Sequence, residues 1–343
     1  MSDQTHLTNL SGDKKAWPVY ITLGNLPSSR RNSPTSMAVL LLALLPIAPK
    51  LSNSSKADQH QRQINSDTLQ DVFELIIAPL QDPAHDSLPI DCANGKVRMC
   101  FSILAAWIAD HMENVALHGI KSNVCPRWEV PAVKLGTNMK LYPGRDYAIY
   151  HNYDYENWIG ETDHADIRPE SLGMRLGQNV FYRLNRISPS DLHKQDMLYT
   201  DYLGLFKHMM HWIQGFLKKQ GRLEAFDEVW KALPPYPGCL VPKKAYREVR
   251  QLEGKDMRNL GRCVLSVLAV ALCQSGSAQL IPFKRALGSV RALVDFNMMA
   301  QYRSHTAETL TYMEDYLDTV HKKQDIFLEF SVTKHIRAKI DEQ

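Results

Sequence analysis

Cysteine and long apolar runs are both scarce in this sequence. Its six cysteines are spread over 343 residues, which is too sparse for a disulfide framework, and no secretory signal opens the chain. We therefore expect free thiols and a reducing compartment, the nucleus or the cytoplasm. The most apolar stretch, residues 37–48, is about twelve residues long, whereas a bilayer-spanning helix needs roughly 20. Pro46 and Pro49 close it off, so it predicts a buried helix and no membrane anchor.

A strong net charge is missing as well. The formal net charge is +3, so charge as a whole does not indicate nucleic-acid binding, and only local basic patches could do so. The glycine patterns of P-loop and dinucleotide-binding proteins are absent, as is the nucleophile elbow of the α/β-hydrolases. The sequence therefore gives no support to those enzyme classes, and we expect no small-molecule cofactor.

Apolar residues are nevertheless numerous enough for a large folded core in two domains. Residues 1–120 predict an α/β unit, and residues 121–190 are irregular and rich in Pro, Gly, Tyr and Asn. From 191 to 343 apolar residues recur three or four positions apart, which predicts an all-α unit. The predicted helical faces are Leu203, Phe206, Met210, Ile213 and Leu217; Leu260, Val264, Leu268 and Ala271; and Leu310, Met313, Leu317 and Val320.

Local patterns in the first 120 residues predict individual elements. Residues 17–23 are rich in aromatic and β-branched side chains and end at a Gly-Asn turn, which predicts a buried strand. Residues 51–67 are polar and predict an exposed loop or a frayed helix start. Residues 68–80 follow helical spacing, with Asp67 as a plausible N-cap. Residues 101–109 fit either a strand or a helix start, because periodicity does not separate the two in so short a run.

Five stretches, taken in order, resemble one protein family. They are SDQTHLTNLSGDKKAWPVYITLGN (2–25), DCANGKVRMCFSILAAWIADHME (91–113), ISPSDLHKQD (187–196), YLGLFKHMMHWIQGFLKK (202–219) and AQYRSHTAETL (300–310). Together they are similar to the fungal Plavaka-type transposases, relatives of the Kyakuja-Dileera-Zisupton group. The resemblance implies a partial RNase H-like α/β core in residues 1–120, a connecting region in 121–190 and a helical insertion domain in 191–343.

The resemblance also implies a chemistry, DNA strand transfer by a DDE-type site. Such a site uses two divalent ions, Mg²⁺ or Mn²⁺, held by acids at the ends of adjacent strands. By this resemblance Asp3 is the first acid and Asp110 the second, with Asp91 as the fallback. The third acid is not placed. The carboxylates in the last helices are more simply interpreted as exposed helix residues: Glu308, Glu314 and Glu329.

Simpler interpretations of these acids stay open. Asp3 could be a solvated residue near a terminus, and Asp110 could cap a helix or a loop. Only two residues precede Asp3, and the chain ends soon after the helices. These ends lead us to expect a transposase fragment that is catalytically incompetent.

Metal-binding patterns other than the acids are weak. The family's Cys-x-x-Cys step is here Cys125-Pro126-Arg127-Trp128, and an indole does not bind zinc, so a zinc site is not expected. His118 and Cys125 remain possible partial ligands. His208 and His211 have a metal-compatible spacing on a predicted helix, but they also suit the boundary of an apolar face. The weakest functional candidates are His193, Asp191 and Asp196.

Local basic patches suggest DNA as a possible partner. Between 207 and 258, Lys and Arg outnumber Asp and Glu, and cations there could contact phosphates. The candidates are Lys218, Lys219, Arg222, Lys243, Lys244, Arg247 and Arg250. A solvated helical face explains the same pattern. A DNA-binding protein without chemistry and a helical protein-interaction module are therefore alternatives to a transposase remnant, and the oligomeric state stays open.

Overall fold

The computed structural model describes most of the chain in two compact units. The described residues are 1–7, 15–47, 55–131, 134, 142–145, 173–174, 179–184, 187, 189–194, 197–234, 236–237, 244–248, 254–273 and 280–329. One unit comprises Met1–Leu135 with Met139–Gln195, and the other comprises Gly136–Asn138 with Asp196–Gln343. Much of the predicted connecting region, 121–190, lies outside the described residues, so its separate status stays a prediction.

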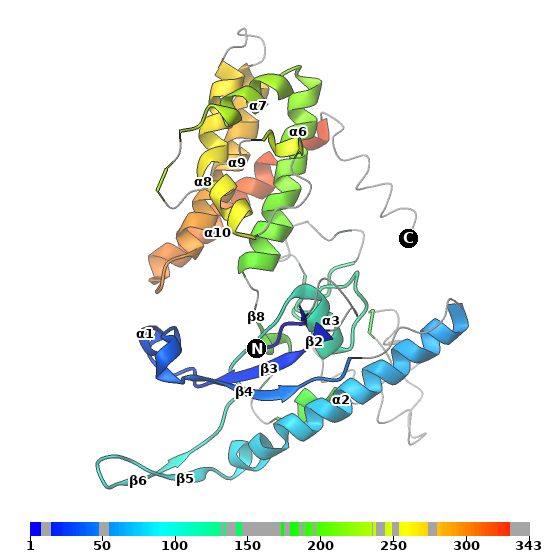
Figure 1. Cartoon of the computed structure of the whole chain (residues 1–343), viewed down its shortest axis with the longest axis vertical. Coiled ribbons are helices and arrows are strands. Elements are labelled where there is room, and N and C mark those ends of the chain that lie inside the picture. Colours follow the sequence, from blue (N-terminus) through cyan, green and yellow to red (C-terminus); the bar gives the residue numbers. More distant parts are fainter. Residues whose placement is uncertain are drawn as a thin grey trace. The chain divides into compact units, whose positions relative to one another are not determined.

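The first unit is mixed α/β with short strands around one long helix (Figure 1). Its strands are β1 (Thr5–His6), β2 (Lys15–Ala16), β3 (Pro18–Thr22), β4 (Val39–Leu44), β5 (Leu88–Asp91), β6 (Val97–Cys100), β7 (Trp107–Ile108) and β8 (His193–Lys194). Its helices are α1 (Ser28–Arg31), η1 (Pro34–Ser36), α2 (Ser55–His85), α3 (His111–His118), η5 (Val180–Arg183) and α5 (Pro189–Leu192).

The start of the chain links two of the strand pairs. β3 and β4 are antiparallel, and Ser2 forms a further antiparallel bridge with Val19 of β3. On its other side, the Ser2 amide donates a 3.1 Å hydrogen bond to the Ile108 carbonyl of β7, and β7 pairs in parallel with β8. The strand segments therefore lie in the order β4, β3, Met1–Ser2, β7 and β8, with the chain start at the centre.

Helix α2 supplies the core beneath this ladder because its apolar residues follow helical spacing. Leu69, Phe73 and Ile77 are buried together with Trp107 of β7 and Phe181 of η5. The Phe73 ring centroid lies 5.4 Å from that of Trp107 and 5.5 Å from that of Phe181. Aromatic pairs prefer such edge-to-face and tilted orientations over a face-to-face sandwich, so these contacts stabilise the core. The predicted strand at 17–23 is confirmed as β3, but only Pro18 and Val19 of it are buried. The predicted helix at 68–80 is confirmed as part of α2.

Two local predictions are wrong. Residues 37–48 are not a buried helix, because residues 39–44 form β4 in register with β3. Its leucines are largely exposed, with Leu41 at 58%, and in Figure 1 the β3–β4 ribbon extends outward to α1. Asp67 is not an N-cap, because α2 begins at Ser55. The polar residues before it continue the helix, supported by i,i+4 bonds such as Gln63 Nε2 to Asp67 Oδ1 at 2.9 Å.

The run at 101–109, for which strand and helix were both open, is strand only at Trp107–Ile108. The preceding residues, 101–106, have no regular structure.

The second unit is helical, as the spacing of its apolar residues predicts. Its elements are the π-helix η6 (Met197–Phe206), α6 (Lys207–Lys219), α7 (Leu223–Lys231), η7 (Tyr246–Glu248), α8 (Gly254–Cys273), α9 (Leu280–Ala300), α10 (Ala307–Lys323) and α11 (Asp325–Glu329). Phe216 of α6 anchors the core, with its ring centroid 6.0 Å from Phe283 of α9 and 5.9 Å from Phe327 of α11. The predicted faces of α6 and α8 are buried or half-buried, whereas on α10 Val320 is buried and Leu310 is exposed.

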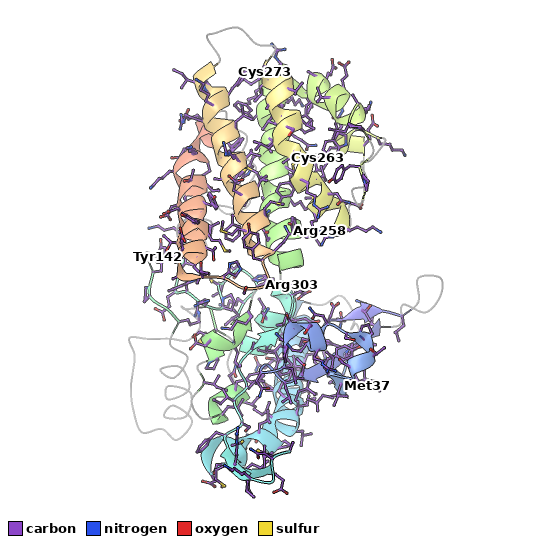
Figure 2. The ribbon with its side chains drawn as sticks, turned by 90° about the vertical axis from the view of Figure 1, so that its left-hand side faces the viewer. Met37, Tyr142, Arg258, Cys263, Cys273 and Arg303 are labelled. Atoms are coloured by element: carbon purple, nitrogen blue, oxygen red, sulfur yellow. The ribbon has the colours of Figure 1, made fainter. Side chains whose placement is uncertain are left out.

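The state of the cysteines and the lengths of the helices can be compared with the expectations of free thiols and of no membrane anchor. Five cysteines are free thiols, and Cys239 lies outside the described residues. Figure 2 shows Arg258, Cys263 and Cys273 in order along α8. Within the described part of the chain, none of the helices combines the length and the apolar character that crossing a membrane requires.

Helix α2 offers a matched test of this core. Phe73 is 1% exposed and Leu75, on the same helix, is 75% exposed. We expect Phe73→Ala to lower the free energy of unfolding of this unit by about 3–5 kcal/mol, because it leaves a cavity beside the Trp107 and Phe181 rings. Leu75→Ala should change it by less than about 0.5 kcal/mol. Urea unfolding followed by circular dichroism measures both, and equal effects of the two variants would contradict this core assignment.

Candidate active site

Asp3 and Asp110 follow two strand segments that lie side by side. Asp3 comes directly after Ser2, which is bonded to Ile108, and Asp110 comes two residues after Ile108. Asp3 is exposed, and Asp110 is half-buried. Asp110 is also the N-cap of α3, where its Oδ1 accepts a 2.7 Å bond from the Glu113 amide. Asp110 is therefore a helix cap, as one of the two interpretations predicts. It also follows the strand that neighbours the segment carrying Asp3.

Glu113 joins these two acids and was not a candidate in the sequence. It is buried on α3, where its Oε2 accepts from Ser2 Oγ and its Oε1 from the Gln4 amide, both at 2.6 Å. Burial raises the pKa of Glu113, the two hydrogen bonds lower it, and the negative charges of Asp110 and Asp3 raise it again. Asp3 and Asp110 therefore each lie within electrostatic reach of Glu113.

The bond between Ser2 and Glu113 is part of a buried chain of side chains. Trp107 Nε1 donates to Ser2 Oγ at 3.1 Å, and Ser2 Oγ donates in turn to Glu113. These hydrogen bonds, with the one from the Gln4 amide, attach the residues on both sides of Asp3 to β7 and α3. A local signal for Glu113 does exist, since an acid three residues after an N-cap acid is typical of a helix start, but it predicts no contact with residues 2–4.

The fallback acid lies elsewhere. Asp91 ends β5, which is in register with β6 from Leu88 opposite Cys100 to Asp91 opposite Val97. In the described part of the chain, this hairpin pairs with neither β3 nor β7. In the described part of the chain, the segment before Asp110, and not the one that ends at Asp91, is therefore hydrogen-bonded to the residue that precedes Asp3.

The acids only partly fit a divalent-ion site. Asp3 and Asp110 offer the carboxylate oxygens that Mg²⁺ and Mn²⁺ prefer, and Mg²⁺ commonly keeps several waters beside one or two carboxylates. Both oxygens of Glu113 already accept protein hydrogen bonds. Across the residues that can be described, no group of three or more His, Cys, Asp or Glu is arranged to hold a metal.

The three late acids occupy exposed helix positions, as the sequence suggests. Glu308 accepts a 2.7 Å bond from the Tyr312 hydroxyl, and Glu329 accepts bonds of 2.8 and 3.0 Å from Arg285. Glu314 is exposed on α10. The third acid therefore stays unplaced.

The histidine and cysteine candidates are scattered. His118 is wholly buried in α3, and Cys125 is half-buried in the following loop. His208 lies on α6, where burial, helped by the charges of His211 and Lys207, lowers its pKa.

The SPSDLHKQD candidates are described only in part. His193 pairs with Trp107 through its backbone, and Asp191 is exposed. The His193 side chain and Asp196 lie outside the described residues.

The basic candidates divide into two places. Lys218 and Lys219 end α6, and Arg222 is the residue before α7, across the turn at Gly221. Arg247 of η7 contacts the buried Asp227 of α7, with its Nε 2.8 Å from Oδ2, so its charge serves the fold of the helical unit.

Lys244, near Arg247, is exposed, and the remaining two candidates, Lys243 and Arg250, lie outside the described residues.

The helical unit contains a buried acid besides Asp227. Asp201 of η6 is 6% exposed, and burial raises its pKa to about 7. With its amide oriented to donate, Asn297 of α9 lies 2.7 and 2.8 Å from the two Asp201 oxygens. Sequence reasoning missed Asp201 because one acid in an apolar helix has no distinctive spacing.

A mixed α/β unit that contains the candidate acids is followed in the sequence by a helical unit. The comparison with family models gives the class: the description that matches is Plavaka transposase, over residues 1–213. This match includes more than half of the chain, and the protein therefore belongs to the Plavaka transposase family. The comparisons find no match among curated proteins and none among solved structures.

The titration of Asp201 gives a test of the helical unit. Because its pKa rises from 3.8 to about 7 on folding, its contribution to stability is complete below pH 3.8 and is lost as the pH rises to about 7. The loss is on the order of 4 kcal/mol at most. Asp201→Asn should remove this dependence and be more stable than the wild type at pH 8.

Urea unfolding of the helical unit at pH 5 and pH 8 measures this difference, and Asp315→Asn at an exposed α10 position is the control. An unchanged pH dependence in Asp201→Asn would show that Asp201 is not buried as described.

Proposed function

We propose that this chain carries part of an RNase H-like DNA strand-transfer core, with Asp3 and Asp110 as its first two catalytic acids. One observation supports this most. The segment Met1–Ser2 and β7 are neighbours, and the acids that follow them, Asp3 and Asp110, both raise the pKa of Glu113. An RNase H-like site requires such acids at the ends of adjacent strands. The helical unit corresponds in this proposal to the insertion domain.

The roles of the residues follow from their positions. Asp3 and Asp110 would hold Mg²⁺ or Mn²⁺, which when bound activates the attacking oxygen and stabilises the leaving oxygen of a phosphodiester. Glu113 holds the segment that carries Asp3 through Ser2 and Gln4. Asp110 keeps its orientation through the bond to the Glu113 amide.

We further propose that this chain by itself is catalytically incompetent. The proposal assigns two acids, whereas such a site needs a third, and the oxygens of the nearby Glu113 already accept bonds from protein donors. The five free cysteines suit a reducing compartment, the nucleus or the cytoplasm.

A DNA-binding role without chemistry is the second candidate. It is supported by Lys218 and Lys219, which are exposed side by side at the end of α6, near Arg222. Lysines at a helix C-terminus also complement the helix dipole, so these charges have a structural role as well. A helical protein-interaction module makes no use of the acids or of these cations.

Metal binding separates these proposals. We expect Mn²⁺ to bind the wild-type chain, as measured by the loss of the free-Mn²⁺ electron paramagnetic resonance signal. Asp3→Asn and Asp110→Asn should each weaken binding about tenfold or more, because each removes one carboxylate ligand. Asp91→Asn is the matched control and should bind as the wild type does.

Equal binding by all four proteins would refute the shared site. Salt-dependent DNA binding without specific Mn²⁺ binding would favour the second candidate. Metal-dependent plasmid nicking that is lost in Asp3→Asn would contradict incompetence while supporting the site.

A further inference from the structure

A cavity of about 620 Å³ lies between the strands near the chain start and the first half of α2. Its size falls in the range of small-molecule sites. The lining residues that bear on its chemistry are Gln4, Lys15, Trp17, Gln61, Arg62 and Asn65.

The charge of the lining selects an anion. Lys15 of β2 and Arg62 of α2 are cationic, and none of the described residues that line the cavity is acidic. Arg62 is exposed and Lys15 half-buried, so both ammonium and guanidinium groups can reach a ligand at the mouth. Such groups bind phosphate, Lys as a point charge and Arg through paired N–H donors.

The remainder of the lining suits a flat heterocycle. Trp17 provides an indole, the side chain on which bases stack well. Gln61 and Asn65 lie one turn apart on α2, and Gln61 Nε2 donates to Asn65 Oδ1 at 2.5 Å. Carboxamides carry both donors and acceptors, which is what the edge of a base presents.

The cavity lies next to the candidate acids. Gln4 lines it and directly follows Asp3, and the Gln4 amide is bonded to Glu113 Oε1. Ala116, which also lines it, is on α3 one turn after Glu113. A strand whose phosphodiester reaches Asp3 and Asp110 therefore has an adjacent nucleotide within reach of the cavity.

We infer that this cavity binds one unpaired nucleotide of a DNA strand, with its phosphate at Lys15 and Arg62 and its base against Trp17. The inference rests on the proposed function for the choice of DNA, and it adds a binding site that the acids do not provide. Unstacking a base costs least in a strand that is already single, so single-stranded DNA is the preferred ligand.

The test uses the full chain and a single-stranded oligonucleotide that contains 2-aminopurine, without divalent metal. Lys15→Ala with Arg62→Ala should raise the Kd at least tenfold. Lys96→Ala with Arg98→Ala removes the same charge from the exposed β6 hairpin and should change the Kd less than twofold. Equal loss in both double variants, or no binding by the wild type, would overturn the inference.

A second measurement tests the stacking partner. Binding should quench 2-aminopurine fluorescence in the wild type, and Trp17→Leu should remove most of the quenching even where binding is kept. Circular dichroism checks that this variant folds. Quenching that persists in folded Trp17→Leu would place the base elsewhere and overturn the role of the cavity.

Separate measurements distinguish failure of the proposed nucleotide site from failure of the proposed metal site. Lys15→Ala with Arg62→Ala should leave Mn²⁺ binding unchanged, whereas Asp3→Asn should leave metal-free oligonucleotide binding within twofold. Loss of Mn²⁺ binding by Lys15→Ala with Arg62→Ala would show that the cavity variants disturb the acids, and it would contradict a separate nucleotide site.

Discussion

The first unit depends on one buried carboxylate. Glu113 accepts hydrogen bonds from Ser2 and Gln4, residues more than a hundred positions earlier in the chain. These bonds add side-chain contacts to α3 to the backbone bonds that Met1 forms with Tyr20 and that Ser2 forms with Ile108. A buried carboxylate is costly unless it is well bonded, so the arrangement is stable only while both donors are in place. The position of Asp3 follows from it.

The hydrogen bonds of Glu113 also explain why the three acids have different roles. Asp110 is held by the Glu113 amide, and Asp3 lies between the two residues that bond to Glu113. Glu113 therefore acts on the candidate site through position and charge, and its own oxygens are occupied. The cations of the nearby cavity provide the opposite charge that a phosphodiester would need beside three carboxylates.

The sequence predicts those features that have a local cause. Strand β3 and the apolar faces of α6 and α8 follow directly from the spacing of apolar residues. The roles of Asp3 and Asp110 as catalytic acids come from family resemblance and stay a prediction. The contacts of Glu113 were not predictable, because they join residues far apart in the chain and need the fold to exist. Strand β4 was mistaken for a helix, since a short apolar run does not distinguish the two. Its backbone pairing with β3, which the sequence does not reveal, makes it a strand.

The charges of Asp3 and Asp110 both act on the carboxyl group of Glu113. Carbon-detected NMR titration of the Glu113 carboxyl tests it most directly. We predict a pKa above the ordinary 4.5 in the wild type, because burial and the two neighbouring charges raise it. The pKa should fall in Asp3→Asn and again in Asp110→Asn, where Asn retains the helix cap. An identical Glu113 pKa in all three proteins would contradict the shared site.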